Sequence, residues 1–165
     1  MVYLPDGDRK NEQTADIGSA KKKITRYCTY QERAHSEVEA KLYSFNLHYN
    51  QVQELLAWLI TEDYLNEERF AIAFAGGRFR IKQWGKNKIK LFLQRKRVSE
   101  YSINIALNQL DEQDYQQTLI RLITRKSETI AADNIYELRN KVARSIIVKG
   151  YDPEIVWQQT KTIIE

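Results

Sequence analysis

The chain has 165 residues, of which 42 % are hydrophobic, so it can bury a core as one compact domain or a short array of repeated units. With two Pro, six Gly and abundant Leu, Ile, Glu and Lys, the composition favours helices over strands. The single Cys28 excludes an internal disulfide, and no apolar stretch approaches the roughly 20 residues that a bilayer requires. Together with a polar start that lacks a signal-peptide core, these features predict a cytoplasmic protein with no membrane partner.

Apolar residues that recur with a helical period of about 3.6 predict three longer helices. They cover residues 17–33, 66–82 and 113–126. Cys28 lies on the apolar face of the first helix, which indicates a core residue rather than a nucleophile. We expect residues 127–133, which follow the third helix, to form a loop.

After each longer helix, a repeated series of apolar residues predicts two shorter helices. In the first copy the series is Val38, Leu42, Leu47, Val52, Leu55, Leu56 and Leu59. In the second copy it is Ile89, Leu93, Val98, Ile103, Ala106, Leu107 and Leu110. The third copy keeps Val142, Ile146, Tyr151, Val156 and Ile163, although Gln159 and Thr160 interrupt it. Because one three-helix unit buries little surface alone, we expect the units to stack.

Residues at equivalent positions of the repeat predict where these shorter helices begin and end. One register of predicted N-caps contains Ser36, Asn87 and Asn140, and Ser36 with Glu39 resembles a capping box. A second register contains His48, Ser99 and Asp152, with Pro153 at the first helical position. Between the two short helices, where a left-handed residue often closes a helix, stand Asn46, Arg97 and Gly150.

The repeat predicts an all-α fold of three tandem three-helix repeats that form an elongated, curved array. We expect a disordered polar tail at 1–16, followed by repeats at 17–61, 62–110 and 111–165.

Basic residues are concentrated between residues 78 and 97, in the second repeat, where no acidic residue occurs. Nine of the 26 basic residues lie there, while the rest of the chain is acidic on balance. Such a stripe indicates a binding surface for a polyanionic partner. The alternative interpretation is that these residues form a solvated helix face. Trp84 could stack on a base or seal the junction between two helices. The predicted DNA- or filament-binding residues are Arg78, Arg80, Lys82, Trp84, Lys86, Lys88, Lys90, Arg95, Lys96 and Arg97.

The sequence gives little support for a catalytic or a metal-binding motif. The stretch 85–87 lacks the Ser or Thr of a phosphate-binding loop, and His35, His48 and Cys28 do not have metal-ligand spacing. Four acids near the start of the 66–82 helix suggest a nuclease site, but the helix dipole explains them better: Glu62, Asp63, Glu67 and Glu68. We therefore expect no enzyme activity, no metal and no cofactor.

Four stretches of the chain match motifs of one known protein family. The segment 32–42 resembles the family's opening motif, and Tyr64-Leu65-Asn66-Glu67-Glu68-Arg69-Phe70-Ala71 resembles its Y-L-D-D-E-R-F-A hallmark. The segments 84–93 and 149–151 resemble two further motifs in the family's order. The chain thus resembles the RecX family, the regulators of the RecA recombinase. The chain departs from the pattern where Asn66 and Glu67 replace two Asp, where Asn46 and Arg97 replace glycines, and where Phe92 replaces a Glu.

The resemblance implies tandem three-helix repeats, binding to RecA, inhibition of the RecA filament and its ATPase, and some affinity for DNA. The first hypothesis is thus a regulator that binds the RecA–DNA filament, with RecA and single-stranded DNA as partners and a monomer as the expected state. The alternative is a stand-alone helical protein that binds the phosphate backbone of DNA. In that case Lys88 and Lys90 suit phosphates better than base edges.

Overall fold

The computed structural model describes residues 16–165, and every regular element in this range is a helix. In chain order they are α1 (Ile17–Tyr30), α2 (His35–Tyr43), α3 (Tyr49–Thr61), α4 (Glu67–Lys82), α5 (Lys86–Arg95), α6 (Glu100–Asn108), α7 (Glu112–Thr129), α8 (Ile135–Val148) and α9 (Pro153–Ile163). None of the helices in this range is long and apolar enough to cross a membrane. The tail predicted at 1–16 lies outside the described residues except for Asp16, whose carboxylate caps α1.

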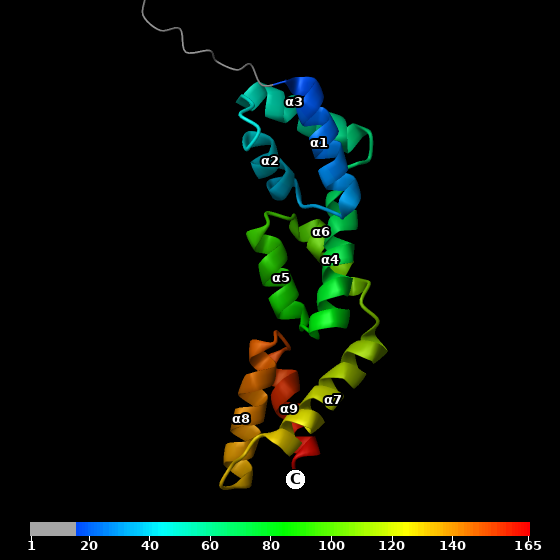
Figure 1. Cartoon of the computed structure of the whole chain (residues 1–165). Coiled ribbons are helices and arrows are strands. Elements are labelled where there is room, and N and C mark those ends of the chain that lie inside the picture. Colours follow the sequence, from blue (N-terminus) through cyan, green and yellow to red (C-terminus); the bar gives the residue numbers. More distant parts are fainter. Residues whose placement is uncertain (1–15) are drawn as a thin grey trace, which may run out of the picture.

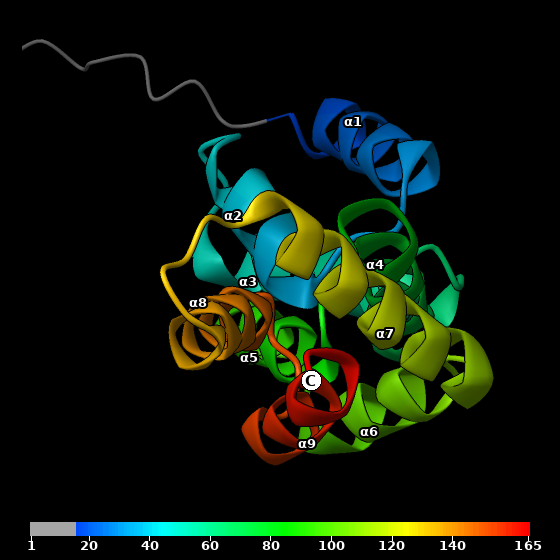
Figure 2. The same ribbon diagram turned by 90° about the horizontal axis from the view of Figure 1, so that it is seen from below.

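The helices form three units that are stacked along one direction (Figure 1). We call α1–α3 unit 1, α4–α6 unit 2 and α7–α9 unit 3. In the view along the stack, α7, α8 and α9 project near their counterparts α4, α5 and α6 (Figure 2). The predicted all-α fold of three-helix units is therefore confirmed.

The repeated apolar positions form the core of each unit. Val38, Ile89 and Val142 occupy the same place in the three copies, and each is 0 % exposed. Leu42, Leu93 and Ile146 are also fully buried at the next position. Removing such residues from water is the main force that holds helices of this length together.

The predicted closures between the two short helices of each unit are confirmed. Asn46, Arg97 and Gly150 have φ angles of 59°, 60° and 100°, which is the left-handed region. The second register of N-caps is also correct, since His48, Ser99 and Asp152 immediately precede α3, α6 and α9. Pro153 occupies the first turn of α9, where its missing N–H costs no hydrogen bond.

The first register of predicted N-caps is wrong. Ser36 lies inside α2 and donates its hydroxyl to the Lys96 carbonyl, while Asn87 lies inside α5. Asn140 lies in the middle of α8 and donates to the Tyr136 carbonyl. Ala34 and Gly85 are the actual N-caps of α2 and α5, so packing and contacts with other units decide these helix starts.

Two further predictions differ from the structure. The Ser36–Glu39 capping box is not formed, because Glu37 instead accepts a hydrogen bond from the Ala34 N–H at 2.9 Å. The loop predicted at 127–133 begins later, since α7 continues to Thr129. The hydroxyl of Thr129 donates to the Arg125 carbonyl one turn earlier, which supports this last turn.

The three units are not joined in the same way. Buried residues of units 2 and 3 form one continuous apolar cluster, which also takes in Ala34. The other buried residues of unit 1 form a separate cluster with Leu65. Polar contacts cross from unit 1 to unit 2, and Lys96 and Arg69 both bind acids that precede or lie in α2. Units 2 and 3 thus share one core, whereas unit 1 keeps a separate core and contacts unit 2 through the buried Ala34 and through ion pairs.

Candidate nucleic-acid interface

The turn between α4 and α5 positions the centre of the predicted stripe. α4 ends at Lys82. The next residue, Gln83, has φ 55° in the left-handed region, and its N–H donates to the Phe79 carbonyl at 2.9 Å. Trp84 follows, and Gly85 is the N-cap of α5. The reversal brings the last turn of α4 beside the first turns of α5, so that side chains from both helices meet at Trp84.

Cations lie against aromatic rings across this junction in an arrangement that we call the Trp84 ladder: Phe74, Arg78, Trp84, Lys88, Phe92 and Arg95. The guanidinium of Arg78 lies 4.9 Å from the Phe74 ring centre and 5.2 Å from that of Trp84. The Lys88 ammonium lies 4.6 Å from the Trp84 ring centre, and the Trp84 and Phe92 ring centres are 4.7 Å apart. Arg95 lies 5.2 Å from the Phe92 ring centre. Such contacts orient the cations without neutralising them.

The structure shows one of the two roles considered for Trp84, the seal between helices. Trp84 is partly buried against the shared core of units 2 and 3, so it does seal the junction between helices. Its ring also supports Arg78 and Lys88, which form no ion pair within the described residues. The ladder therefore presents positive charges that are held against aromatic side chains.

Four other residues of the predicted stripe are paired with acids. Lys86 and Lys90 bind Glu112 at 2.7 Å and Glu100 at 2.6 Å. Lys96 binds Glu37, and Arg97 lies 3.3 Å from Glu39. These ion pairs tie α5 and its C-terminal turn to α7, α6 and α2. They also cancel charge, so the open part of the stripe is narrower than the sequence indicates.

The remaining two residues lie on the exposed side of α4. The Arg80 guanidinium folds back over Gly76, since a Cβ at Gly76 would lie 2.7 Å from its terminal nitrogen. Lys82 is exposed, and its carbonyl accepts a hydrogen bond from Lys149 Nζ at 3.1 Å. Neither side chain forms an ion pair within the described residues, so both add to the open positive charge.

Unit 3 contributes a cation that sequence reasoning missed. Lys149 reaches back to α4, and its partial burial, together with the nearby charges of Lys126 and Lys88, lowers its pKa. A lowered lysine pKa reports a positive local potential. Lys149 is far from the stripe in sequence, and its only signal was its place in the 149–151 motif.

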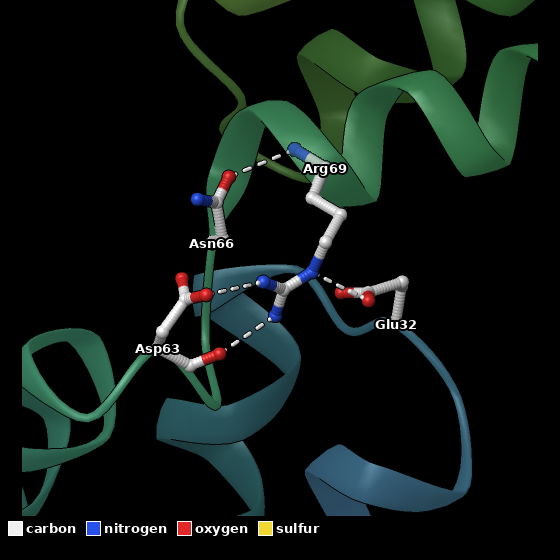
Figure 3. A network of polar contacts seen from close by, with 4 residues as sticks. All are labelled: Glu32, Asp63, Asn66 and Arg69. Carbon is white, nitrogen blue, oxygen red and sulfur yellow. Dashed lines mark hydrogen bonds and ion pairs between the residues drawn. The ribbon is translucent and has the colours of Figure 1, made fainter.

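The hallmark segment 64–71 forms a junction rather than an open site (Figure 3). The Asn66 side chain caps α4 by accepting from the Arg69 N–H at 2.9 Å. Arg69 Nε lies 2.6 Å from Glu32, and a terminal nitrogen lies 3.1 Å from Asp63. Arg69 therefore binds an acid before α2 and an acid before α4 at once, which links units 1 and 2.

The four acids considered for a nuclease site do not converge. Glu67 accepts hydrogen bonds from the hydroxyls of Ser99 and Ser102, whereas Asp63 faces Arg69. Glu67 and Glu68 lie in the first turn of α4, where the helix dipole favours them. Within residues 16–165, His, Cys, Asp and Glu side chains form no group of three or more suited to a metal ion. Cys28 is buried, and this burial raises the pKa of its thiol to about 11.

The fold and this surface define a tandem three-helix-repeat protein with a partly exposed cation–aromatic patch. Residues 66–107 match the family model for the second three-helix domain of RecX. The regulatory protein RecX of Clostridium perfringens is 29 % identical over 122 residues, which cover 73 % of this chain and 57 % of that protein. The regulatory protein RecX of Bacillus cytotoxicus is 23 % identical over 130 residues, covering 79 % and 48 %.

A solved structure of a RecX protein has a similar fold. The crystal structure of RecX from Lactobacillus salivarius superposes with a TM-score of 0.80 at 23 % identity, covering 89 % of this chain and 96 % of that chain. The family model, the curated relatives and the solved structure all support the RecX family. It spans about half the length of the curated relatives it matches.

Proposed function

We propose that this protein regulates a RecA recombinase by binding the RecA–DNA filament and inhibiting its recombinase and ATPase activities. The observation that carries the proposal is the Trp84 ladder, an open positive surface in the middle of an elongated repeat array of the RecX family. Phosphates of single-stranded DNA in the filament are the partner that such a surface suits.

The distribution of charge and shape supports a filament over isolated DNA. Four of the stripe's cations are used in ion pairs between helices, so the open part of the stripe offers few contacts to DNA on its own. An elongated array, by contrast, offers a long face on which a protein partner adds contact area (Figure 1). In this proposal DNA contacts at the ladder orient the protein, and contacts with RecA provide specificity.

An ATPase titration tests the proposal. Purified protein is added to its cognate RecA with ATP and single-stranded DNA in large excess, and ATP turnover is followed. Excess DNA removes simple competition for free strands, so the expected result is suppression that persists under these conditions. Unchanged turnover at a severalfold molar excess of the protein would instead support the stand-alone DNA-binding alternative.

A further inference from the structure

An open cavity of about 480 Å³ lies on unit 1, remote in sequence from the Trp84 ladder. Among residues 16–165, its charged lining consists of five cations and no acid: Lys22, Lys23, Arg26, Arg33 and Lys41. Within the described residues, none of these cations forms an ion pair with a carboxylate. The cavity is therefore strongly positive.

The junction with unit 2 explains why these cations remain open. Three acids lie close to them in sequence, but each is directed toward unit 2. Glu32 binds Arg69, Glu37 binds Lys96, and Glu39 binds Arg97. Assembly of the array thus withdraws the acids of unit 1 and leaves its cations facing solvent. A solvated helix face would keep acids interspersed among the cations.

Aromatic rings line the same cavity and hold several of its cations in place. The guanidinium of Arg33 lies 3.8 Å from the Tyr27 ring centre, and its Nε donates to the Tyr27 carbonyl at 3.2 Å. Lys23 and Lys41 each lie 5.7 Å from the centre of the Phe45 ring. Tyr30, the last residue of α1, is 82 % exposed, and this degree of exposure leaves its ring accessible.

We propose that this cavity binds single-stranded nucleic acid, with phosphates among the five cations and a base stacked on Tyr30. Its volume lies in the range of pockets that hold small organic groups, roughly 300–1,000 Å³. An acidic protein segment would satisfy the cations but has no use for an exposed aromatic ring, whereas every base has a face that stacks on one. The site is separate from the Trp84 ladder, so each chain can hold two segments of strand.

Photocrosslinking tests which ring a base contacts. The full chain is irradiated with a single-stranded oligonucleotide that carries 5-iodouracil, and the crosslinked residues are identified by mass spectrometry. The expected result is a crosslink at Tyr30. Tyr30→Ala should weaken binding of the oligonucleotide at least about fivefold, the size of one lost stacking contact. The control is Tyr49→Ala, since Tyr49 belongs to the same unit and is 66 % exposed outside the cavity.

Charge variants separate nucleic acid from other polyanions. Lys22→Gln with Arg26→Gln should weaken binding and reduce its salt dependence, while Arg125→Gln with Lys161→Gln removes the same charge outside the cavity. An oligonucleotide without bases should bind more weakly and should not respond to Tyr30→Ala. Competition by polyglutamate as effective as that of the oligonucleotide would overturn the proposal in favour of an acidic protein partner. Crosslinks confined to Trp84 would also overturn it, and would leave the proposed regulation of RecA intact.

Discussion

Gly85 and Gly150 lie in direct backbone contact, one at the start of α5 and the other just after α8. The Gly85 N–H donates to the Lys149 carbonyl at 2.8 Å, and the Asn87 N–H donates to the Gly150 carbonyl at 2.9 Å. A Cβ on Gly85 would lie 2.3 Å from the carbonyl carbon of Gly150. Units 2 and 3 are thus joined by main-chain hydrogen bonds, which only two residues without side chains allow at this distance.

Gly85→Ala should destabilise the protein, because the new methyl group would clash with backbone that cannot rotate away. We expect a loss of about 1–3 kcal/mol in the free energy of unfolding, the size of an overpacked contact. The matched control is Gly77→Ala in α4, where a Cβ meets no atom of the described residues within 4 Å. That change should stabilise the helix by up to about 1 kcal/mol. Urea denaturation of the two variants gives both values, and equal effects would contradict the close contact.

The buried positions could be predicted from the sequence because a helical period repeats in all three units. This pattern alone predicts the burial of Val52, Ile103 and Val156, and all three are 0 % exposed. The starts of α2 and α5 could not be predicted in the same way. At the start of α5, the N–H groups of Gly85 and Asn87 donate to the carbonyls of Lys149 and Gly150 in another unit, a contact that no local signal encodes.

Only the part of the candidate surface that depends on residues close in sequence could be predicted. Arg78, Trp84 and Lys88 lie close together in sequence, so their clustering on two adjoining helices was foreseeable. The pairing of Lys86 with Glu112 depends on how α7 packs, and hence on tertiary structure. The cavity on unit 1 was missed because only the fold brings Arg33 and Lys41 beside the cations of α1, while it directs their sequence neighbours Glu32, Glu37 and Glu39 elsewhere.

Gln83→Gly should stabilise the protein. Gln83 closes α4 with φ 55°, a left-handed conformation that costs a residue with a side chain roughly 1 kcal/mol or somewhat more. Its carbonyl accepts from the Tyr151 hydroxyl, and glycine keeps that carbonyl. We expect a gain of up to about 1 kcal/mol, reduced by the greater freedom of glycine in the unfolded chain. Thermal unfolding measures this gain, and a clear loss would show that the Gln83 side chain contributes contacts of its own.

Low pH should weaken the junction between units 1 and 2, because it protonates the carboxylate of Glu37. Burial acts to raise the pKa of this carboxyl, but hydrogen bonds from Lys96 and the Ala34 N–H outweigh it, and the pKa lies below its ordinary value of 4.5. Because the folded pKa is the lower one, this contribution to stability is complete above pH 4.5 and is lost as the pH falls through the folded value.

The comparison of Glu37→Gln with wild type tests this acid dependence. The variant should be less stable near neutral pH, and its free energy of unfolding should fall less steeply below pH 4.5. Glu128→Gln is the control, since Glu128 is exposed and forms no ion pair within residues 16–165. Urea denaturation over a series of pH values supplies the curves. Parallel curves for wild type and Glu37→Gln would rule out a role for this ion pair.

The last prediction concerns the open and paired halves of the basic stripe. Arg78→Gln with Lys88→Gln removes two charges of the Trp84 ladder, while Lys86→Gln with Lys90→Gln removes two charges that already bind Glu112 and Glu100. If the ladder contacts phosphates, the first pair should weaken binding to single-stranded DNA strongly. Each lost phosphate contact should also lower the slope of log affinity against log salt by about 0.7.

The second pair should have a smaller effect on DNA affinity and a larger effect on stability, because it breaks contacts between helices and leaves Glu112 and Glu100 unneutralised. Fluorescence anisotropy at several salt concentrations measures affinity, and thermal unfolding of the same samples measures stability. The two double variants carry the same net charge, so a difference between them reports position alone. Equal losses of affinity would mean that DNA responds to overall charge, and the assignment of the ladder as the contact surface would be wrong.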